Sequence, residues 1–121
     1  MNDIAIIGAG FSSAVLSHYL GRDDIIIFEK ARGPGGRSST RKVEGVGVFD
    51  HGLQYITPKS KEFLEFIKNL SLVKKWNGDF VELGDATSVL PATDKYIGIS
   101  GNNDFVKSTL NLDQCKFNHK I

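Results

Sequence analysis

A short turn with two glycines, placed between an apolar run and a helical pattern, constrains the fold of this chain more than any other feature. The run Ile4–Ile7 is apolar and lacks alternation, which is typical of a parallel strand covered on both faces. Apolar residues then recur at helical spacing over 12–20, and Ile25–Phe28 repeats the strand pattern. The opening segment therefore predicts a β, α, β order, as in an α/β fold with a parallel sheet.

The turn carries the pattern G-x-G-x-x-G with one departure. Gly8 permits the tight turn and Gly10 lets the backbone approach a phosphate. Ser13 stands where glycine or alanine is usual, and serine is only slightly larger. The N–H groups at the helix start, from Phe11 and Ser12 onward, face the same place. We therefore predict that Gly8, Gly10, Phe11, Ser12 and Ser13 bind a diphosphate.

A carboxylate follows at the end of the second strand. Glu29 lies 21 residues after Gly8, where its oxygens can accept hydrogen bonds from both ribose hydroxyls of an adenosine. A carboxylate there repels a 2′-phosphate, which favours a nonphosphorylated ribose, although Arg32 nearby leaves the phosphorylated cofactor open. Strand, turn, helix and acidic residue together predict dinucleotide binding.

The segment 30–42 is a basic loop with five positive and no negative side chains. Paired glycines let this loop fold over a diphosphate from the side opposite the helix, and Arg37 can donate bidentate hydrogen bonds to it. A nucleic-acid partner is not expected, because the loop has no interleaved aromatic residues and a cofactor motif adjoins it. The whole chain has a formal charge of +1, so bulk electrostatics favour neither a polyanion nor an anionic membrane.

The stretch 28–41 (FEKARGPGGRSSTR) resembles the flavin-containing amine oxidase superfamily. In that superfamily a β, α, β ADP-binding unit is followed by an acidic residue, a basic residue and a Gly-Gly-Arg turn. Glu29, Lys30 and then Gly35, Gly36 and Arg37 match this order. The resemblance implies that Glu29, Lys30, Gly36 and Arg37 contact an FAD cofactor.

The stretch 49–57 (FDHGLQYIT) narrows the resemblance to the renalase-like branch of the superfamily. In that branch a strand of the form D-x-G-x-Q-Y passes beside the flavin ring. Asp50 and Gly52 match, and the resemblance adds Gln54 and Tyr55 as cofactor-binding residues. The segment 96–110 resembles the branch more weakly, with Ser100 and Asn102 at positions where proline and methionine are usual.

The resemblance implies a Rossmann-like, three-layer α/β FAD-binding fold, present here as the incomplete amino-terminal half of a two-domain flavoprotein. Residues 1–121 are then a truncated FAD/NAD(P)-binding domain, with the substrate domain largely absent. In the family, the flavin takes hydride from an amine or a dihydronicotinamide and passes electrons to oxygen. A small-molecule substrate is therefore possible, and no catalytic residue is assigned.

Two other functions remain open. A non-catalytic nucleotide-binding module or remnant fits the short chain. An NAD-dependent dehydrogenase accounts for the segment 8–29 but leaves the Gly-Gly-Arg turn and the segment 50–55 without a role.

The rest of the chain predicts further elements. We expect a strand over 46–55, then a helix capped by Thr57 with Pro58 first, ending near 76–78 with Trp76 on its core face. Short strands are predicted at 80–83 and 96–99, then a helix from Asn102 or Asn103 to about 110 and a last strand around Cys115.

The composition excludes several classes of protein. With a single cysteine there is neither an intramolecular disulfide framework nor a multi-cysteine metal site, which indicates a reducing, cytoplasmic location. No run approaches the roughly 18 to 20 apolar residues that cross a bilayer, so no membrane association is expected.

His51 beside Asp50 is a weak acid–base candidate, because neighbours on a strand point to opposite faces. The strand at 4–7 is expected to lose a neighbour, which favours self-association through its edge.

Overall fold

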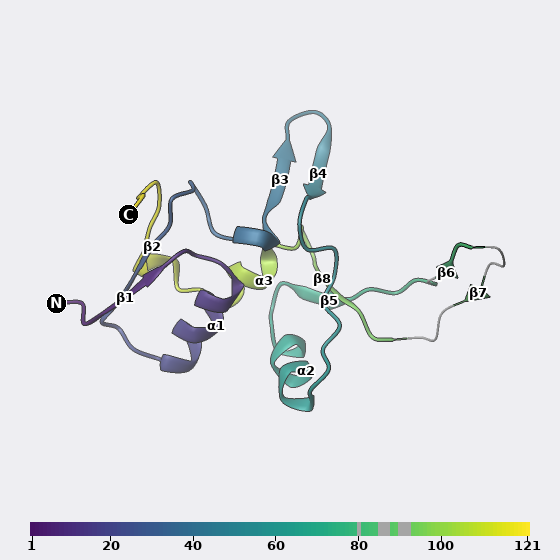
Figure 1. The fold of residues 1–121 in the computed structure, drawn as a ribbon, viewed down its shortest axis with the longest axis horizontal. Helices are drawn as coiled ribbons and strands as arrows, with labels where there is room; N and C mark the ends of the chain where they lie inside the picture. The colour runs from purple at the N-terminus through teal and green to yellow at the C-terminus, as the bar shows by residue number, and fades with distance from the viewer. Residues whose placement is uncertain (80, 85–87, 90–92) are drawn as a thin grey trace.

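A computed structural model describes residues 1–79, 81–84, 88–89 and 93–121. No helix among these residues has the length and apolar character that a bilayer span requires. In chain order (Figure 1) the elements are β1 (Ile4–Ile7), α1 (Phe11–Leu20), β2 (Ile25–Phe28), η1 (Gly36–Ser38), β3 (Thr40–Val43), β4 (Gly47–Asp50), α2 (Lys61–Lys68), β5 (Val73–Lys75), β6 (Val81–Glu82), β7 (Ser88–Val89), β8 (Tyr96–Gly98), α3 (Asp104–Lys107), η2 (Leu112–Gln114) and β9 (Cys115–Lys116).

A parallel sheet in the order β1-β2-β9 confirms the α/β class and the predicted β, α, β opening. The register joins Ile4 to Ile25 and Ile7 to Phe28, so β1 and β2 end side by side. The backbone N–H of Gly8 then donates to the Phe28 carbonyl over 2.7 Å. Because the two strands end together, the glycine turn and Glu29 emerge at the same edge of the sheet.

The helices α1 and α3 cover one face of this sheet. Inward-facing Ile6, Ile25 and Ile27 pack against helix residues such as Ala14 and Val106 in one buried cluster. On the opposite face Ile7 is 65% exposed and Ala5 is also exposed. Within the described ranges β1 pairs with β2 alone, so its outer edge is open as the sequence predicted.

A second cluster joins α2 to the antiparallel pair β5 and β8. Its buried residues are Ile67, Leu70, Tyr96 and Phe105. Phe11, the first residue of α1, contacts both clusters, and its ring centroid lies 5.9 Å from that of Phe105. The glycine turn is therefore anchored to the core immediately beyond its last glycine.

The predicted strand over 46–55 is wrong in extent. Only Gly47–Asp50 is a strand, and it forms a hairpin with Thr40–Val43, which the sequence placed in the basic loop. Figure 1 shows this hairpin projecting from the body of the protein. Gly45 has φ +73°, and the N–H of Val46 donates to the Val43 carbonyl over 3.1 Å. The tight turn makes strand pairing possible for residues with no apolar pattern of their own.

The predicted cap of the next helix is also wrong. Ser60, rather than Thr57, is the N-cap, and its side chain accepts a 3.1 Å hydrogen bond from the N–H of Phe63. Ile56 forms a bridge with Tyr96, and residues 57–59 after it are not helical. It ends at Lys68, because the following residues turn into β5.

Three further predictions need correction. Trp76 follows β5 instead of lying on a helix, and it is 39% exposed. The strand expected at 80–83 is reduced to Val81–Glu82, with Phe80 outside the described residues, and β8 pairs with β5. The helix expected up to 110 is regular only over Asp104–Lys107.

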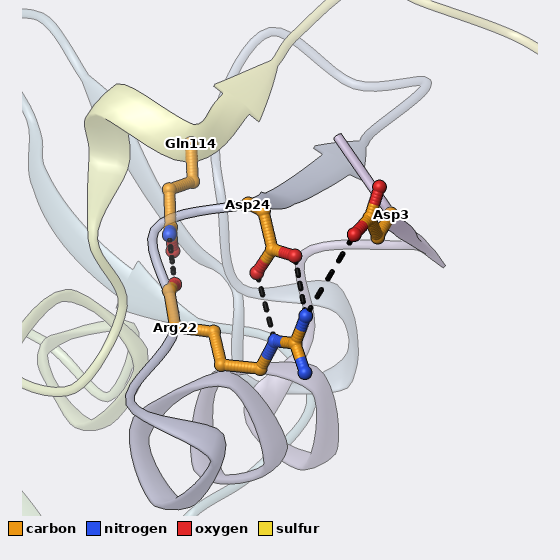
Figure 2. A network of polar contacts seen from close by, with 4 residues as sticks. All are labelled: Asp3, Arg22, Asp24 and Gln114. Carbon is orange, nitrogen blue, oxygen red and sulfur yellow. Dashed lines mark hydrogen bonds and ion pairs between the residues drawn. The ribbon is translucent and has the colours of Figure 1, made fainter. Parts of the chain in front are cut away.

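A polar network ties the amino-terminal edge of the sheet together (Figure 2). Nε of Arg22 donates to Asp24 over 2.8 Å, and its Nη2 lies 4.0 Å from the Asp3 carboxylate. The Gln114 amide donates to the Arg22 carbonyl over 2.7 Å, which links η2 to the start of β2. The hydrogen bond from Arg22 lowers the pKa of Asp24 to about 2.

Candidate functional site

The two glycine motifs lie against each other at the carboxyl edge of the sheet. The N–H of Gly35 donates to the Ala9 carbonyl over 2.9 Å, and Gly10 and Gly35 form an isolated parallel bridge. A Cβ placed on Gly36 would stand 3.4 Å from the Cα of Gly10. The segments around residues 9 and 35 therefore form the two walls of one site.

Between these walls is a cleft of about 650 Å³. Nine of the eleven residues predicted to bind a cofactor line it: Gly8, Gly10, Phe11, Ser12, Ser13, Glu29, Lys30, Gly36 and Arg37. The lining residues that the sequence did not single out as ligands are Ile7, Ala31, Gly33, Gly35, Ser38 and Ser39.

The amino terminus of α1 offers free donors to the cleft. Its N-cap is Gly10, which provides no side-chain cap, and its first turn has no acidic residue. The first intrahelical bond is made by the N–H of Ala14 to the Gly10 carbonyl. The N–H groups of Phe11, Ser12 and Ser13 therefore lack intrahelical partners, and the positive end of the helix dipole lies with them. This is a site for an anion.

Glu29 is held between the glycine turn and the start of the basic loop. It is 7% exposed; Oε2 accepts a 2.7 Å hydrogen bond from the N–H of Ala9, and Oε1 a 2.8 Å bond from the N–H of Ala31. Each carboxylate oxygen can accept a second hydrogen bond, so acceptors remain for a ligand hydroxyl. The sequence predicted a ligand role for Glu29, but it carried no signal for these two backbone contacts.

The second wall is a tight turn around Arg37. Gly35 and Gly36 have φ +139° and +54°, and the N–H of Ser38 donates to the Gly35 carbonyl over 2.9 Å. Both angles favour glycine. The Arg37 side chain is exposed, and within the described part of the chain it forms no salt bridge. Its guanidinium is therefore available to an anionic ligand.

Gln54 and Tyr55 do not line the cleft. Gln54 is exposed and its carbonyl accepts a 2.9 Å hydrogen bond from the Asn102 amide. The Tyr55 ring lies 5.8 Å from the Trp76 ring, with Nζ of Lys95 5.5 Å from the Tyr55 ring centre. The structure therefore places these two residues apart from the other nine.

Gly52 lies against the turn that carries Arg37. A Cβ on Gly52 would overlap the Arg37 carbonyl oxygen, which also accepts a 2.9 Å hydrogen bond from the N–H of Leu53. A hollow of about 450 Å³ is lined by Arg37, Ser38, Gly52 and Leu53, so it shares two residues with the cleft. The segment 52–53 therefore continues the site beyond Arg37.

Asp50 has a structural arrangement rather than an acid–base one. Its Oδ1 accepts hydrogen bonds from the Thr40 hydroxyl over 2.6 Å and from the N–H of Asn102 over 2.8 Å. Within the described ranges, no hydrogen bond or ion pair joins Asp50 to the exposed His51. Asp50 instead connects the hairpin to the segment before α3.

A further hollow of about 390 Å³ extends the cleft on the other side of Glu29. Its lining includes Phe28 and His119, and it shares four residues with the cleft: Ile7, Gly8, Glu29 and Lys30. The centre of the His119 ring lies 4.8 Å from that of the Phe28 ring. The backbone N–H of His119 donates to the Glu29 backbone carbonyl over 2.9 Å. The sequence carried no signal for this role of the last residues, because main-chain hydrogen bonds do not depend on side-chain identity.

The fold and the cleft define a dinucleotide-binding α/β domain: a glycine turn, a free helix terminus and a strand-end carboxylate meet at one edge of a parallel sheet. A protein family described as NAD(P)-binding Rossmann-like domain matches residues 6–70, more than half of the chain. The chain belongs to this family.

Solved structures of putrescine oxidase show the same fold. Putrescine oxidase bound to putrescine is 22% identical, with a TM-score of 0.50, over 75% of this chain and 22% of that chain. A triple mutant of putrescine oxidase gives the same identity, coverage and TM-score. This chain thus spans about a fifth of the length of the putrescine oxidase chains that it matches. The likeness confirms the fold that the amine oxidase resemblance implied.

Proposed function

We propose that this chain binds FAD and forms the ADP-binding part of a flavin-dependent oxidoreductase of the amine oxidase superfamily, in its renalase-like branch. The observation that carries the proposal is the contact between the two glycine motifs. The N–H of Gly35 donates to Ala9, so the free helix terminus and the Gly-Gly-Arg turn face one cleft. A single diphosphate in that cleft meets donors from both sides.

The donors in the cleft fit a diphosphate. The uncapped N–H groups at the start of α1 satisfy phosphate oxygens on one side, and the Arg37 guanidinium does so on the other. No acidic side chain lies in the first turn of α1, so no carboxylate of that turn competes for this position.

The rest of FAD fits the two hollows beside the cleft. Glu29 would accept from a ribose hydroxyl, and the hollow beside Phe28 and His119 supplies flat, partly apolar walls for a base. The hollow beyond Arg37, which Gly52 lines, lies where the chain can approach a flavin ring closely. When bound, the flavin supplies the capacity to accept a hydride from a small-molecule amine or dihydronicotinamide, and the residues described here hold and orient it.

NAD(P) is the second candidate ligand, because the family that matches residues 6–70 is described as an NAD(P)-binding domain. The buried Glu29 carboxylate favours the nonphosphorylated form. The Gly-Gly-Arg wall supports FAD over NAD(P), since the resemblance to flavin-containing oxidases rests on it.

The visible absorption spectrum of the purified chain, and of the supernatant released by heating, tests the proposal. Flavin bands in near-equimolar amount, or tight binding of added FAD, are expected. A colourless protein that binds ADP but not FAD supports a non-catalytic nucleotide-binding module instead. Thermal protection by NAD(P) and not by FAD supports a dehydrogenase.

Gly10→Val tests the glycine turn, and Gly33→Ala is its control. A Cβ at Gly10 has no neighbour within 4 Å and Gly10 is absent from the positive-φ glycines, so the variant keeps the fold and fills the cleft. Gly33→Ala, which also meets nothing within 4 Å, adds a methyl elsewhere on the cleft wall. We expect Gly10→Val to abolish FAD binding and Gly33→Ala to retain it. Equal FAD binding by both variants would contradict the placement of the diphosphate at this turn.

A further inference from the structure

We propose that Glu29 is a positioning residue that fixes the glycine turn of the cleft to the end of β2, in addition to any contact with a ribose. This inference rests on the proposed function, because it concerns how the same cleft binds a diphosphate. The juxtaposition that carries it is one buried carboxylate between a backbone amide 20 residues earlier in the glycine turn and a backbone amide two residues after Glu29. Oε2 accepts from Ala9, in the glycine turn, and Oε1 from Ala31, at the start of the basic loop.

Ala9 is the point through which this effect reaches the diphosphate. Its side chain is fully buried, its N–H donates to Glu29 and its carbonyl accepts from Gly35. With both polar groups of Ala9 bonded, the orientation of the next peptide is fixed. That peptide leads into Gly10 and the free N–H groups of α1. Glu29 therefore sets the direction in which the anion-binding donors point.

The backbone of Glu29 is itself fixed. Its N–H donates to the Lys116 carbonyl over 2.9 Å, and its carbonyl accepts from the N–H of His119 over 2.9 Å. The neighbouring Ala31 carbonyl accepts from Asn118 over 2.9 Å. A carboxylate on a backbone held from both sides transmits the geometry of the sheet to the turns, which a mobile surface carboxylate cannot do.

Glu29→Gln tests this role, because it gives opposite results under the two interpretations. If Glu29 contacts only the ribose, removing its negative charge leaves inorganic pyrophosphate, which has no ribose, bound equally well or more tightly. If Glu29 positions the glycine turn, its replacement weakens the turn. The NH₂ group of the glutamine then faces the N–H of Ala9 or Ala31, so one of the two hydrogen bonds is lost and pyrophosphate binds more weakly. We expect pyrophosphate and ADP both to bind about tenfold more weakly, the factor for losing one charge-assisted hydrogen bond.

The measurement is an NMR titration of the full chain with ADP and with pyrophosphate, with Glu44→Gln as the matched control. Glu44 is an exposed carboxylate in the turn between β3 and β4, so its replacement removes the same charge without touching the cleft. Glu29→Asp keeps the charge but is one methylene shorter, and it should also weaken pyrophosphate binding. Glu44→Gln should bind both ligands as the wild type does.

Hydrogen exchange in the ligand-free protein supplies a second readout. In Glu29→Gln the amides of Ala9 and Ala31 should exchange about tenfold faster or more, while that of Gly8, bonded to the Phe28 carbonyl, stays protected. Pyrophosphate binding that is unchanged or tighter in Glu29→Gln overturns the positioning role. That result does not contradict the proposal that the chain binds FAD. Wild-type protein that binds neither ADP nor FAD overturns the proposed function, and this inference with it.

Discussion

The N–H of Ala9 donates a 2.7 Å hydrogen bond to Oε2 of Glu29, across 20 residues of sequence. This bond fixes the first glycine turn to the end of the second strand. Because Oε1 of Glu29 also accepts from Ala31, the carboxylate joins the segments before and after β2 to one point. The cleft is thus held together by hydrogen bonds that backbone amides donate to one buried carboxylate.

Arg37→Ala should weaken FAD binding by about 1.5 to 3 kcal/mol, the range for a hydrogen bond to a charged group. The guanidinium lines the cleft and forms no salt bridge among the described residues, so its loss removes ligand contacts without breaking protein contacts. Calorimetric titration of both proteins with FAD measures the difference. Arg41→Ala, on the projecting hairpin, is the control and should bind as the wild type does. Unchanged affinity in Arg37→Ala would exclude the guanidinium from the site.

Gly52→Ala should destabilise the fold by about 1 to 3 kcal/mol, as overpacking commonly does. The added Cβ overlaps the Arg37 carbonyl oxygen, so either the segment 52–53 or the Arg37 turn must shift. Urea denaturation gives the free energy of unfolding. Gly33→Ala adds the same methyl where nothing lies within 4 Å, and its midpoint should match the wild type. Equal midpoints for both variants would show that the contact at Gly52 is relaxed at little cost.

Asn102→Ala should cost about 3 kcal/mol of stability. The side chain is 1% exposed, and it donates to the Leu53 and Gln54 carbonyls and accepts from the N–H of Gly98. Truncation leaves these three backbone groups without their partner, and each buried unsatisfied group costs about 1 to 3 kcal/mol before water relieves part of it. Thermal unfolding followed by circular dichroism reports the loss. Asn103→Ala, next in the chain and without a side-chain cap bond, should change stability by less than about 0.5 kcal/mol.

The Arg22–Asp24 pair predicts how one part of the stability depends on pH. The hydrogen bond from Arg22 lowers the pKa of Asp24 from 3.8 to about 2. A carboxyl whose pKa is depressed by folding stabilises the native state above its unfolded pKa, and this contribution is lost as the pH falls through the folded value. We therefore expect Asp24 to contribute fully above about pH 4 and to lose its contribution toward pH 2. Carbon-detected NMR titration of the carboxyl, with Arg22→Gln as the comparison, should show the pKa return toward 3.8 in the variant.

The open edge of β1 predicts self-association. In the described residues this strand pairs with β2 alone, and its last residue, Ile7, is 65% exposed. Unpaired strands of this kind pair with further chains, and a lysine on the edge opposes such pairing. Sedimentation velocity should show concentration-dependent association of the wild type that Ala5→Lys reduces. Val48→Lys, which adds the same charge on the hairpin, should associate as the wild type does; a monomer at every concentration would contradict the expectation.

The local patterns predicted β1, α1 and β2 well, because apolar periodicity and glycine positions are properties of adjacent residues. They failed where partners lie far apart. Thr40–Val43 carries no apolar alternation and becomes a strand because Gly47–Asp50 pairs with it. Thr57 has a side chain suited to a helix N-cap. It instead follows Ile56, which is bridged to the distant Tyr96, and Ser60 is the N-cap of the helix.

The amino-acid sequence alone determined the β, α, β opening, the glycine turn and the residue types that a dinucleotide needs, since each depends on short-range conformational preferences. Tertiary structure decided that Gly35 docks on Ala9, that Glu29 joins Ala9 and Ala31, and that Gln54 and Tyr55 lie outside the cleft. These are hydrogen bonds and contacts between segments distant in sequence. Their geometry follows from where the strands end and how the loops cross, which no local pattern contains.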